Sequence, residues 1–146
     1  MAVVTSNSSS LKITKKQETI STALEEAKTK TLNKKRTIKE LKAPVNRIAQ
    51  NSQAELNTTI NRIYFKKMKT KWANHSKNNN LTINTLLKYL PDDLIEYMIY
   101  HETAHAIERK HNENFWALIN KKHPNHDANE KDLLTYWFII QKQLPN

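Results

Sequence analysis

The sequence predicts an α+β fold in which a small antiparallel hairpin packs on a helix, with mostly helical parts before and after it. Apolar residues recur at helical spacing over most of the 146 residues. Residues 58–71 and 81–83 instead concentrate β-branched and aromatic residues on either side of an Asn-rich turn. A chain of this length suffices for one domain with a core of its own.

The N-terminal part is predicted to contain two helices. Residues 1–10 are rich in Ser, Thr and Asn, and we expect them to be frayed. Residues 15–41 have a loosely amphipathic pattern, and Pro44 marks a boundary before a second helix over residues 45–56. We therefore expect a basic extension over residues 1–40, partly disordered or helical, and the main domain over residues 41–146.

Turn and capping residues predict the remaining elements. Residues 78–80 are three asparagines that suit the turn of the hairpin, and residues 86–90 are expected to form a short helix. Pro91 opens the next helix, where Asp92 and Asp93 complement the helix dipole. Asn112 can cap a further helix, and the last helix is expected over residues 129–143.

Positive charge is concentrated in the first half of the chain. Residues 1–71 contain 16 Lys and Arg against 5 Asp and Glu, whereas residues 72–146 contain 8 against 9. This asymmetry favours attraction to a polyanion such as nucleic acid, although solubility and a general bias toward Lys explain it about equally well.

The absence of cysteine limits the metal chemistry. With no thiolate in the sequence, any zinc ion must be held by imidazole or carboxylate groups. The sequence also has no apolar run long enough for a signal peptide or a membrane span. We therefore expect a cytoplasmic protein that is not associated with a membrane.

The most informative motif is His-Glu-x-x-His at residues 101–105, inside a predicted helix. Two histidines four residues apart are rotated by only about 40° and displaced by about 6 Å, so both imidazoles can reach one metal ion. Glu102 can then take a proton from water that the metal activates and pass it to a leaving amine. Isolated core histidines are the alternative, but a carboxylate in an apolar stripe is costly unless it is neutralised or used.

A catalytic zinc ion needs a third protein ligand and one open position. His111 is the best candidate, although a histidine in a solvent-facing loop is the alternative. Six residues after His105, it would lie about 240° round a continuous helix, so it can join the site only if the helix breaks near residues 108–110. His75, His123 and His126 are not expected to be ligands.

Residues 63–140 resemble the YgjP-like members of the SprT/WLM group of zinc metallopeptidases. The shared landmarks keep their order along the chain: Met68, Trp72, Pro91, the His-Glu-x-x-His motif, His111 and Phe115-Trp116. Ala73 and His75 stand where the family has Gly and Cys. The resemblance implies a zincin-like α+β fold and one zinc ion per chain, held by His101, His105 and His111. It also implies that Glu102 is the catalytic acid and base, and that Trp72 packs beneath the site.

We therefore predict a zinc-dependent metallopeptidase acting on a protein or peptide. Proteins associated with nucleic acid are candidate substrates, because relatives in the group remove DNA-protein crosslinks and the N-terminal half is basic. The alternative is a nucleic-acid-binding module with a structural zinc ion, for which His75 is the candidate fourth ligand, or with an inactive site. His75 or Tyr136 is a candidate oxyanion donor. The sequence predicts no oligomeric state.

Aromatic and basic residues allow two interpretations each. Trp72, Phe115 and Trp116 could stack on bases, but aromatic residues beside apolar helix positions are more often core. Residues 66–71 contain four lysines, which could line a cleft or protect an edge strand from pairing.

Overall fold

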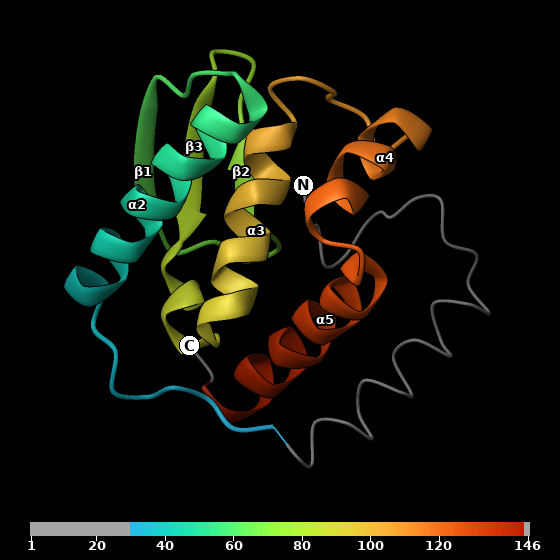
Figure 1. Cartoon of the computed structure of the whole chain (residues 1–146). Helices are drawn as coiled ribbons and strands as arrows, with labels where there is room; N and C mark the ends of the chain where they lie inside the picture. The colour runs from blue at the N-terminus through green and yellow to red at the C-terminus, as the bar shows by residue number, and fades with distance from the viewer. Residues whose placement is uncertain (1–29, 145–146) are drawn as a thin grey trace.

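The computed structural model describes residues 30–144 and confirms the α+β class (Figure 1). The helices and strands of this part, in chain order, are α2 (Ile38–Leu56), β1 (Arg62–Lys66), β2 (Ala73–His75), β3 (Asn80–Asn84), the 3-10 helix η1 (Thr85–Tyr89), α3 (Asp92–Ala104), α4 (Glu113–Lys122) and α5 (His126–Gln143). The frayed tail expected at residues 1–10 and the predicted helix over residues 15–29 lie outside the described residues. The division between residues 1–40 and 41–146 stays a prediction, although α2 begins three residues ahead of it.

Helix α2 corrects two predictions. Residues 30–36 are not helical, and the helix begins after Thr37, whose hydroxyl accepts from the Glu40 N–H while the Glu40 carboxylate accepts from the Thr37 N–H. This capping box satisfies two backbone groups at the first turn. Pro44 lies inside the helix and does not mark a boundary. The free-energy cost of a proline inside the helix is offset by the burial of a stripe of residues at helical spacing: Leu41, Val45, Ala49, Ser52 and Leu56.

Asparagine occupies the two positions of left-handed backbone, a conformation that glycine adopts most readily. Asn57 (φ 52°) ends α2, and Asn79 (φ 62°) lies in the turn between β2 and β3. The chain contains no Gly, and Asn is the residue that next most readily adopts this conformation. The Asn-rich turn predicted at residues 78–80 is therefore confirmed.

The sheet has the strand order β1-β3-β2, and its topology differs from the prediction. The hairpin at the Asn-rich turn pairs β2 with β3 in antiparallel fashion, so its first strand is Ala73–His75 and not the run over residues 58–71. Strand β1 pairs with β3 in parallel. A loop over residues 67–72 reverses the chain between β1 and β2, which is why β1 cannot be the partner of β3 in the hairpin.

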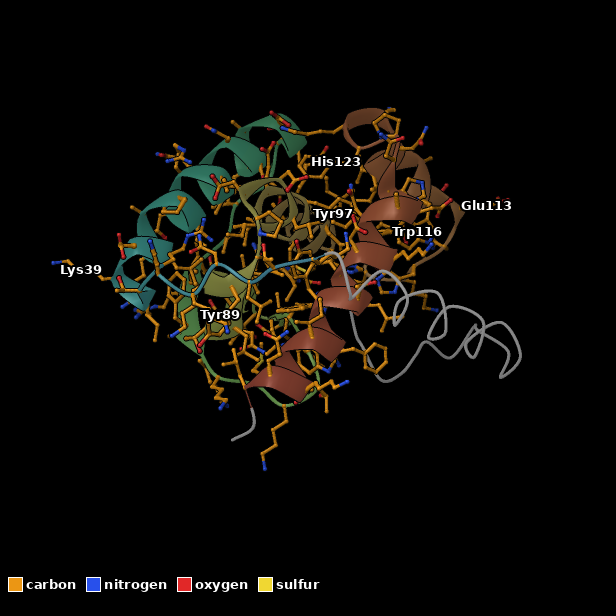
Figure 2. All side chains as sticks on the ribbon, turned by 90° about the horizontal axis from the view of Figure 1, so that it is seen from below. Lys39, Tyr89, Tyr97, Glu113, Trp116 and His123 are labelled. Carbon is orange, nitrogen blue, oxygen red and sulfur yellow. The ribbon has the colours of Figure 1, made fainter. Side chains whose placement is uncertain are left out.

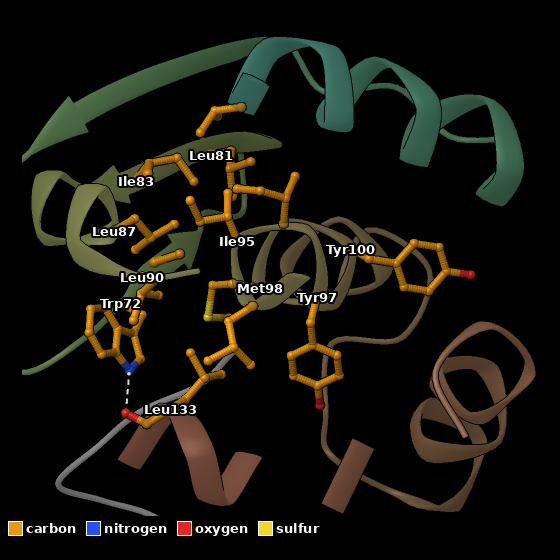
Figure 3. Close-up of a cluster of buried hydrophobic side chains, with 14 of the residues drawn as sticks. Trp72, Leu81, Ile83, Leu87, Leu90, Ile95, Tyr97, Met98, Tyr100 and Leu133 are labelled. Atoms are coloured by element: carbon orange, nitrogen blue, oxygen red, sulfur yellow. Dashed lines mark hydrogen bonds between the residues drawn. The ribbon is translucent and has the colours of Figure 1, made fainter. Parts of the chain in front are cut away.

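The core lies between the sheet and the helices. Helices α2 and α3 lie side by side on one face of the sheet (Figure 1). Trp72 is fully buried, donates from Nε1 to the Leu133 carbonyl (3.3 Å) and packs edge-to-face on Trp137, which anchors α5 (Figure 3). Phe115 is also fully buried, so both residues are core residues as expected.

The other helix boundaries agree closely with the sequence prediction. Helix η1 lies where the short helix was expected, and α3 follows Pro91. Helix α4 is capped by Asn112, whose side chain accepts from the Phe115 N–H. Helix α5 begins at His126, three residues earlier than predicted. Within residues 30–144, no helix combines the length and apolar character needed to cross a bilayer.

The loop between β1 and β2 depends on one buried side chain, Asn84. Its Nδ2 donates to the carbonyls of Met68 (3.0 Å) and Lys71 (2.7 Å), and its Oδ1 accepts from the Leu86 N–H (3.0 Å). Asn84→Ala leaves these backbone groups without a partner. We expect the free energy of unfolding to fall by about 2–4 kcal/mol in urea denaturation.

A matched control is Asn78→Ala in the exposed turn, which should change the free energy of unfolding by less than about 0.5 kcal/mol. Equal stability of the Asn84 and Asn78 variants would show that the loop does not depend on the buried carboxamide.

Candidate metal centre

Helix α3 positions the His-Glu-x-x-His motif inside the protein. Ten of its thirteen residues are buried, because the sheet and α2 cover one side while α4 and α5 lie beyond the other. The side chains of His101 and Glu102 are fully buried, and His105 is 4% exposed. The motif therefore lies inside the molecule and not on a solvated helix face.

The chain turns back directly after the second histidine. Helix α3 ends at Ala104, and the N–H groups of Ala106 and Ile107 bond to carbonyls three residues earlier in a tight turn. The break thus comes a few residues before the predicted position at residues 108–110. It returns the chain toward α3, so that His111, which is exposed, faces the two buried histidines.

Side chains hold this returning loop at both ends. Arg109 donates to the His75 carbonyl (3.2 Å) and lies 3.2 Å from His75 Nδ1, which ties the loop to β2. Asn112 donates to the Glu108 carboxylate (2.9 Å) while it caps α4. These bonds fix the backbone on both sides of His111.

The Nε2 atoms of the three histidines converge. His111 Nε2 lies 3.2 Å from His101 Nε2 and 3.2 Å from His105 Nε2. A tetrahedral zinc ion with bonds of about 2.0–2.1 Å would hold its nitrogen ligands roughly 3.3 Å apart. The three imidazoles therefore fit one zinc ion, and among the described residues they are the group of donors that could hold a metal.

The Nδ1 atoms of the two buried histidines, which point away from the convergence of the Nε2 atoms, each lie close to an oxygen atom. His105 Nδ1 lies 3.0 Å from the Glu108 carbonyl, and His101 Nδ1 lies 3.1 Å from Glu130 Oε2. A carbonyl can only accept, so His105 carries its proton on Nδ1 and leaves Nε2 with a lone pair for a metal. The Glu130 carboxylate favours the same tautomer of His101.

Glu130, on α5, was not predicted from the sequence. Burial would raise the pKa of its carboxyl, but the neighbouring His101 imidazole, together with a hydrogen bond from the Tyr97 hydroxyl, holds that pKa below its usual value. A signal does exist in the sequence, because Glu130 precedes Leu133 and Trp137 at helical spacing and so places a charge on the buried stripe of α5.

Aromatic rings support the exposed third histidine. The His111 ring stacks on Trp116 (5.7 Å between centroids, 23° between planes), and Trp116 stacks in turn on His126 (5.0 Å, 20°). Trp116, which is labelled in Figure 2, also meets the His101 ring edge to face (5.8 Å between centroids). Trp116 thus lines the site and is only partly buried.

The remaining candidates do not join the three-histidine group. His75 has Arg109 at Nδ1 and Asn79 Oδ1 at Nε2 (2.6 Å), so both ring nitrogens are engaged elsewhere. The ring of His123 packs against those of Tyr97 and Tyr100, and burial lowers its pKa. Tyr136 is buried beneath the Lys30 ammonium group.

Comparisons with known proteins show the family and the fold. The sequence matches the family described as "YgjP-like, metallopeptidase domain" over residues 2–136. No curated protein gives a significant match. The fold is similar to the metallopeptidase zymogen abylysin of Pyrococcus abyssi (22% identity, TM-score 0.52, 70% of this chain and 97% of that one). It is also similar to the metallopeptidase zymogen jannalysin of Methanocaldococcus jannaschii (27% identity, TM-score 0.54, 68% and 97%).

The contact between Glu130 and His101 can be tested through metal affinity. Removal of a carboxylate that orients a metal-binding histidine weakens metal binding by about 10- to 100-fold. We expect Glu130→Ala to raise the zinc Kd by that factor in competition with a chelating indicator, and Glu130→Gln to have a smaller effect because it keeps a neutral acceptor.

Glu96→Ala is a suitable control, because Glu96 is half exposed on the same helix as His101 and lies beside Lys122. It should bind zinc like the wild type. Unchanged zinc affinity in Glu130→Ala would show that Glu130 does not support zinc binding by His101.

Proposed function

Since the chain belongs to the YgjP-like metallopeptidase family, we propose that it hydrolyses peptide bonds with one zinc ion held by His101, His105 and His111. The observation that carries this proposal is the convergence of the three histidines, with His111 Nε2 3.2 Å from both His101 Nε2 and His105 Nε2. When bound, a zinc ion polarises a peptide carbonyl and makes water acidic enough to act as a nucleophile near neutral pH. The predicted cytoplasmic location is part of the same proposal.

Glu102 is the general base in this proposal. Its Oε2 lies 3.9 Å from His101 Nε2, so the carboxylate is next to the point where the imidazole nitrogens converge. It would take a proton from the attacking water and return it to the leaving nitrogen of the peptide. The same carboxylate would then reach both the attacking water and the leaving nitrogen. Because Glu102 is fully buried, the proton cannot be lost readily to bulk water.

The substrate class is a protein or peptide, and its scissile bond would approach from the exposed side of His111. An extended segment commonly binds beside the edge of a sheet. Strand β2 is an edge, but Arg109 already bonds to the His75 carbonyl, so a substrate would pair with β2 elsewhere or displace this guanidinium. His75 and Tyr136 are not assigned as oxyanion donors, because the His75 ring nitrogens face Arg109 and Asn79 and the Tyr136 ring lies beneath the Lys30 ammonium group.

The alternative is a structural zinc ion in a nucleic-acid-binding module. A structural site is closed by four protein ligands. Within residues 30–144 the donor group consists of three histidines, and His75 is held away from it by Arg109 and Asn79. This arrangement favours the catalytic site, and the variants below separate the two functions.

The ligand set predicts the metal content. Elemental analysis of the purified wild-type protein should give one zinc ion per chain, and His111→Ala should lose most of it on dialysis because only two ligands remain. Lys110→Ala, in the same loop, is the matched control and should keep its zinc. A wild-type protein that takes up no zinc after reconstitution would overturn the proposal.

The general base predicts the activity of Glu102→Gln. The amide cannot accept a proton, so hydrolysis of casein or a quenched fluorescent peptide should fall by about 100- to 10,000-fold, with zinc retained. Glu113→Gln, in the exposed first turn of α4, should be fully active. Full activity of zinc-loaded Glu102→Gln would show that another residue is the general base. A zinc-loaded wild type that hydrolyses no substrate would favour the structural zinc site.

A further inference from the structure

The sheet has a second face, directed away from α2 and α3. Side chains alternate along a strand, so the odd-numbered residues of β1 point toward the helices and the even-numbered ones point outward. Arg62, Tyr64 and Lys66 are all exposed, and Tyr64 retains 48% exposure. Since a covering element would bury these side chains, no described part of the chain lies over this face.

Tyr64 lies within a continuous polar row across the sheet. It is in register with Thr82 of β3, which is in register with Asn74 of β2. Arg62 and Lys66 flank it on its own strand, two residues away in each direction. An aromatic ring that is half exposed among polar and basic neighbours contributes little to a core, so packing does not explain its position.

Beside this row, the loop after β1 forms a basic hollow of about 500 Å³. Its lining includes four lysines and two residues of the row, and no acidic side chain: Lys66, Lys67, Lys69, Lys71, Asn74 and Thr82. Only Lys66 belongs to a strand, so the alternative in which all four lysines protect an edge strand does not hold. The other lysines project instead from the loop whose Met68 and Lys71 carbonyls accept hydrogen bonds from the buried Asn84 side chain.

We propose that this outer face, with Tyr64 at its centre and the 66–71 loop at its side, binds single-stranded nucleic acid. Lysines provide phosphate contacts, and an exposed aromatic ring on a sheet provides a platform on which a base can stack. Protection of an edge strand by Lys explains Lys66, but it does not explain an exposed ring between two cations. The proposal is independent of the peptidase activity.

The test is fluorescence anisotropy of a labelled 12-nucleotide oligothymidylate with the full chain at 50 mM salt. Tyr64→Ala should weaken binding by about 10-fold, the effect of one lost base stack, whereas Tyr64→Phe should stay within about twofold of the wild type. A zinc content equal to that of the wild type verifies that each variant is folded.

The phosphate contacts are tested by salt dependence. The double variant Lys66→Gln/Lys69→Gln should make the slope of log K against log salt shallower by about 1.4, the value for two phosphate contacts on a single strand. The charge-matched control Lys34→Gln/Lys35→Gln, at exposed positions outside this face, should leave the slope closer to that of the wild type.

The proposal is overturned by no binding at 50 mM salt, by equal binding of Tyr64→Ala and the wild type, or by equal losses in the two lysine double variants. The last two would show that the net charge of +10 attracts any polyanion without a defined surface. Tighter binding of a matched duplex than of the single strand would also contradict it, because a base in a duplex cannot stack on Tyr64.

Discussion

The structure is organised around three imidazole nitrogens that converge, with His111 Nε2 3.2 Å from the Nε2 atoms of both His101 and His105. The Glu108 carbonyl and the Glu130 carboxylate favour the tautomers of His105 and His101 with the proton on Nδ1, which leaves the Nε2 lone pairs of these two histidines directed toward His111. A proton on His111 Nε2 would satisfy these lone pairs, and a metal cation would be bound by all three nitrogens at once. The tight turn after Ala104 and the Arg109 contact hold His111 at this point, as the proposed zinc site requires.

The position of Glu130 links this site to the hydrophobic core. Glu130 and Leu133 lie three residues apart, on the same side of α5. The Leu133 carbonyl accepts from Trp72, whose ring also packs against Trp137. Trp72 precedes β2, so the sheet fixes α5 and α5 fixes the carboxylate at His101. Packing at a distance thus orients a side chain of the proposed zinc site, which is the way supporting shells of metal sites generally work.

The parts predicted correctly from the sequence are those that depend on local spacing. The motif on α3, the convergence of His111 with it, the Asn112 cap and the Asn-rich turn each follow from a few neighbouring residues. The errors concern contacts between distant residues. The parallel pairing of β1 depends on Asn84, and the passage of α2 through Pro44 depends on a stripe buried by α3 and η1. Glu130 was missed because its partner lies 29 positions away on another helix.

The sheet also separates the two surfaces that the chain offers to other molecules. The histidines contact rings of α4 and a carboxylate of α5, on the side of α3 away from the sheet. Arg62, Tyr64 and Lys66 lie beyond the opposite face of the sheet. The sheet and α3 therefore lie between the three histidines and the outer face. A polyanion bound on the outer face would not block the approach of a peptide to His111. A chain held on nucleic acid could then still cleave a neighbouring protein, which would make the basic face a means of raising the local substrate concentration.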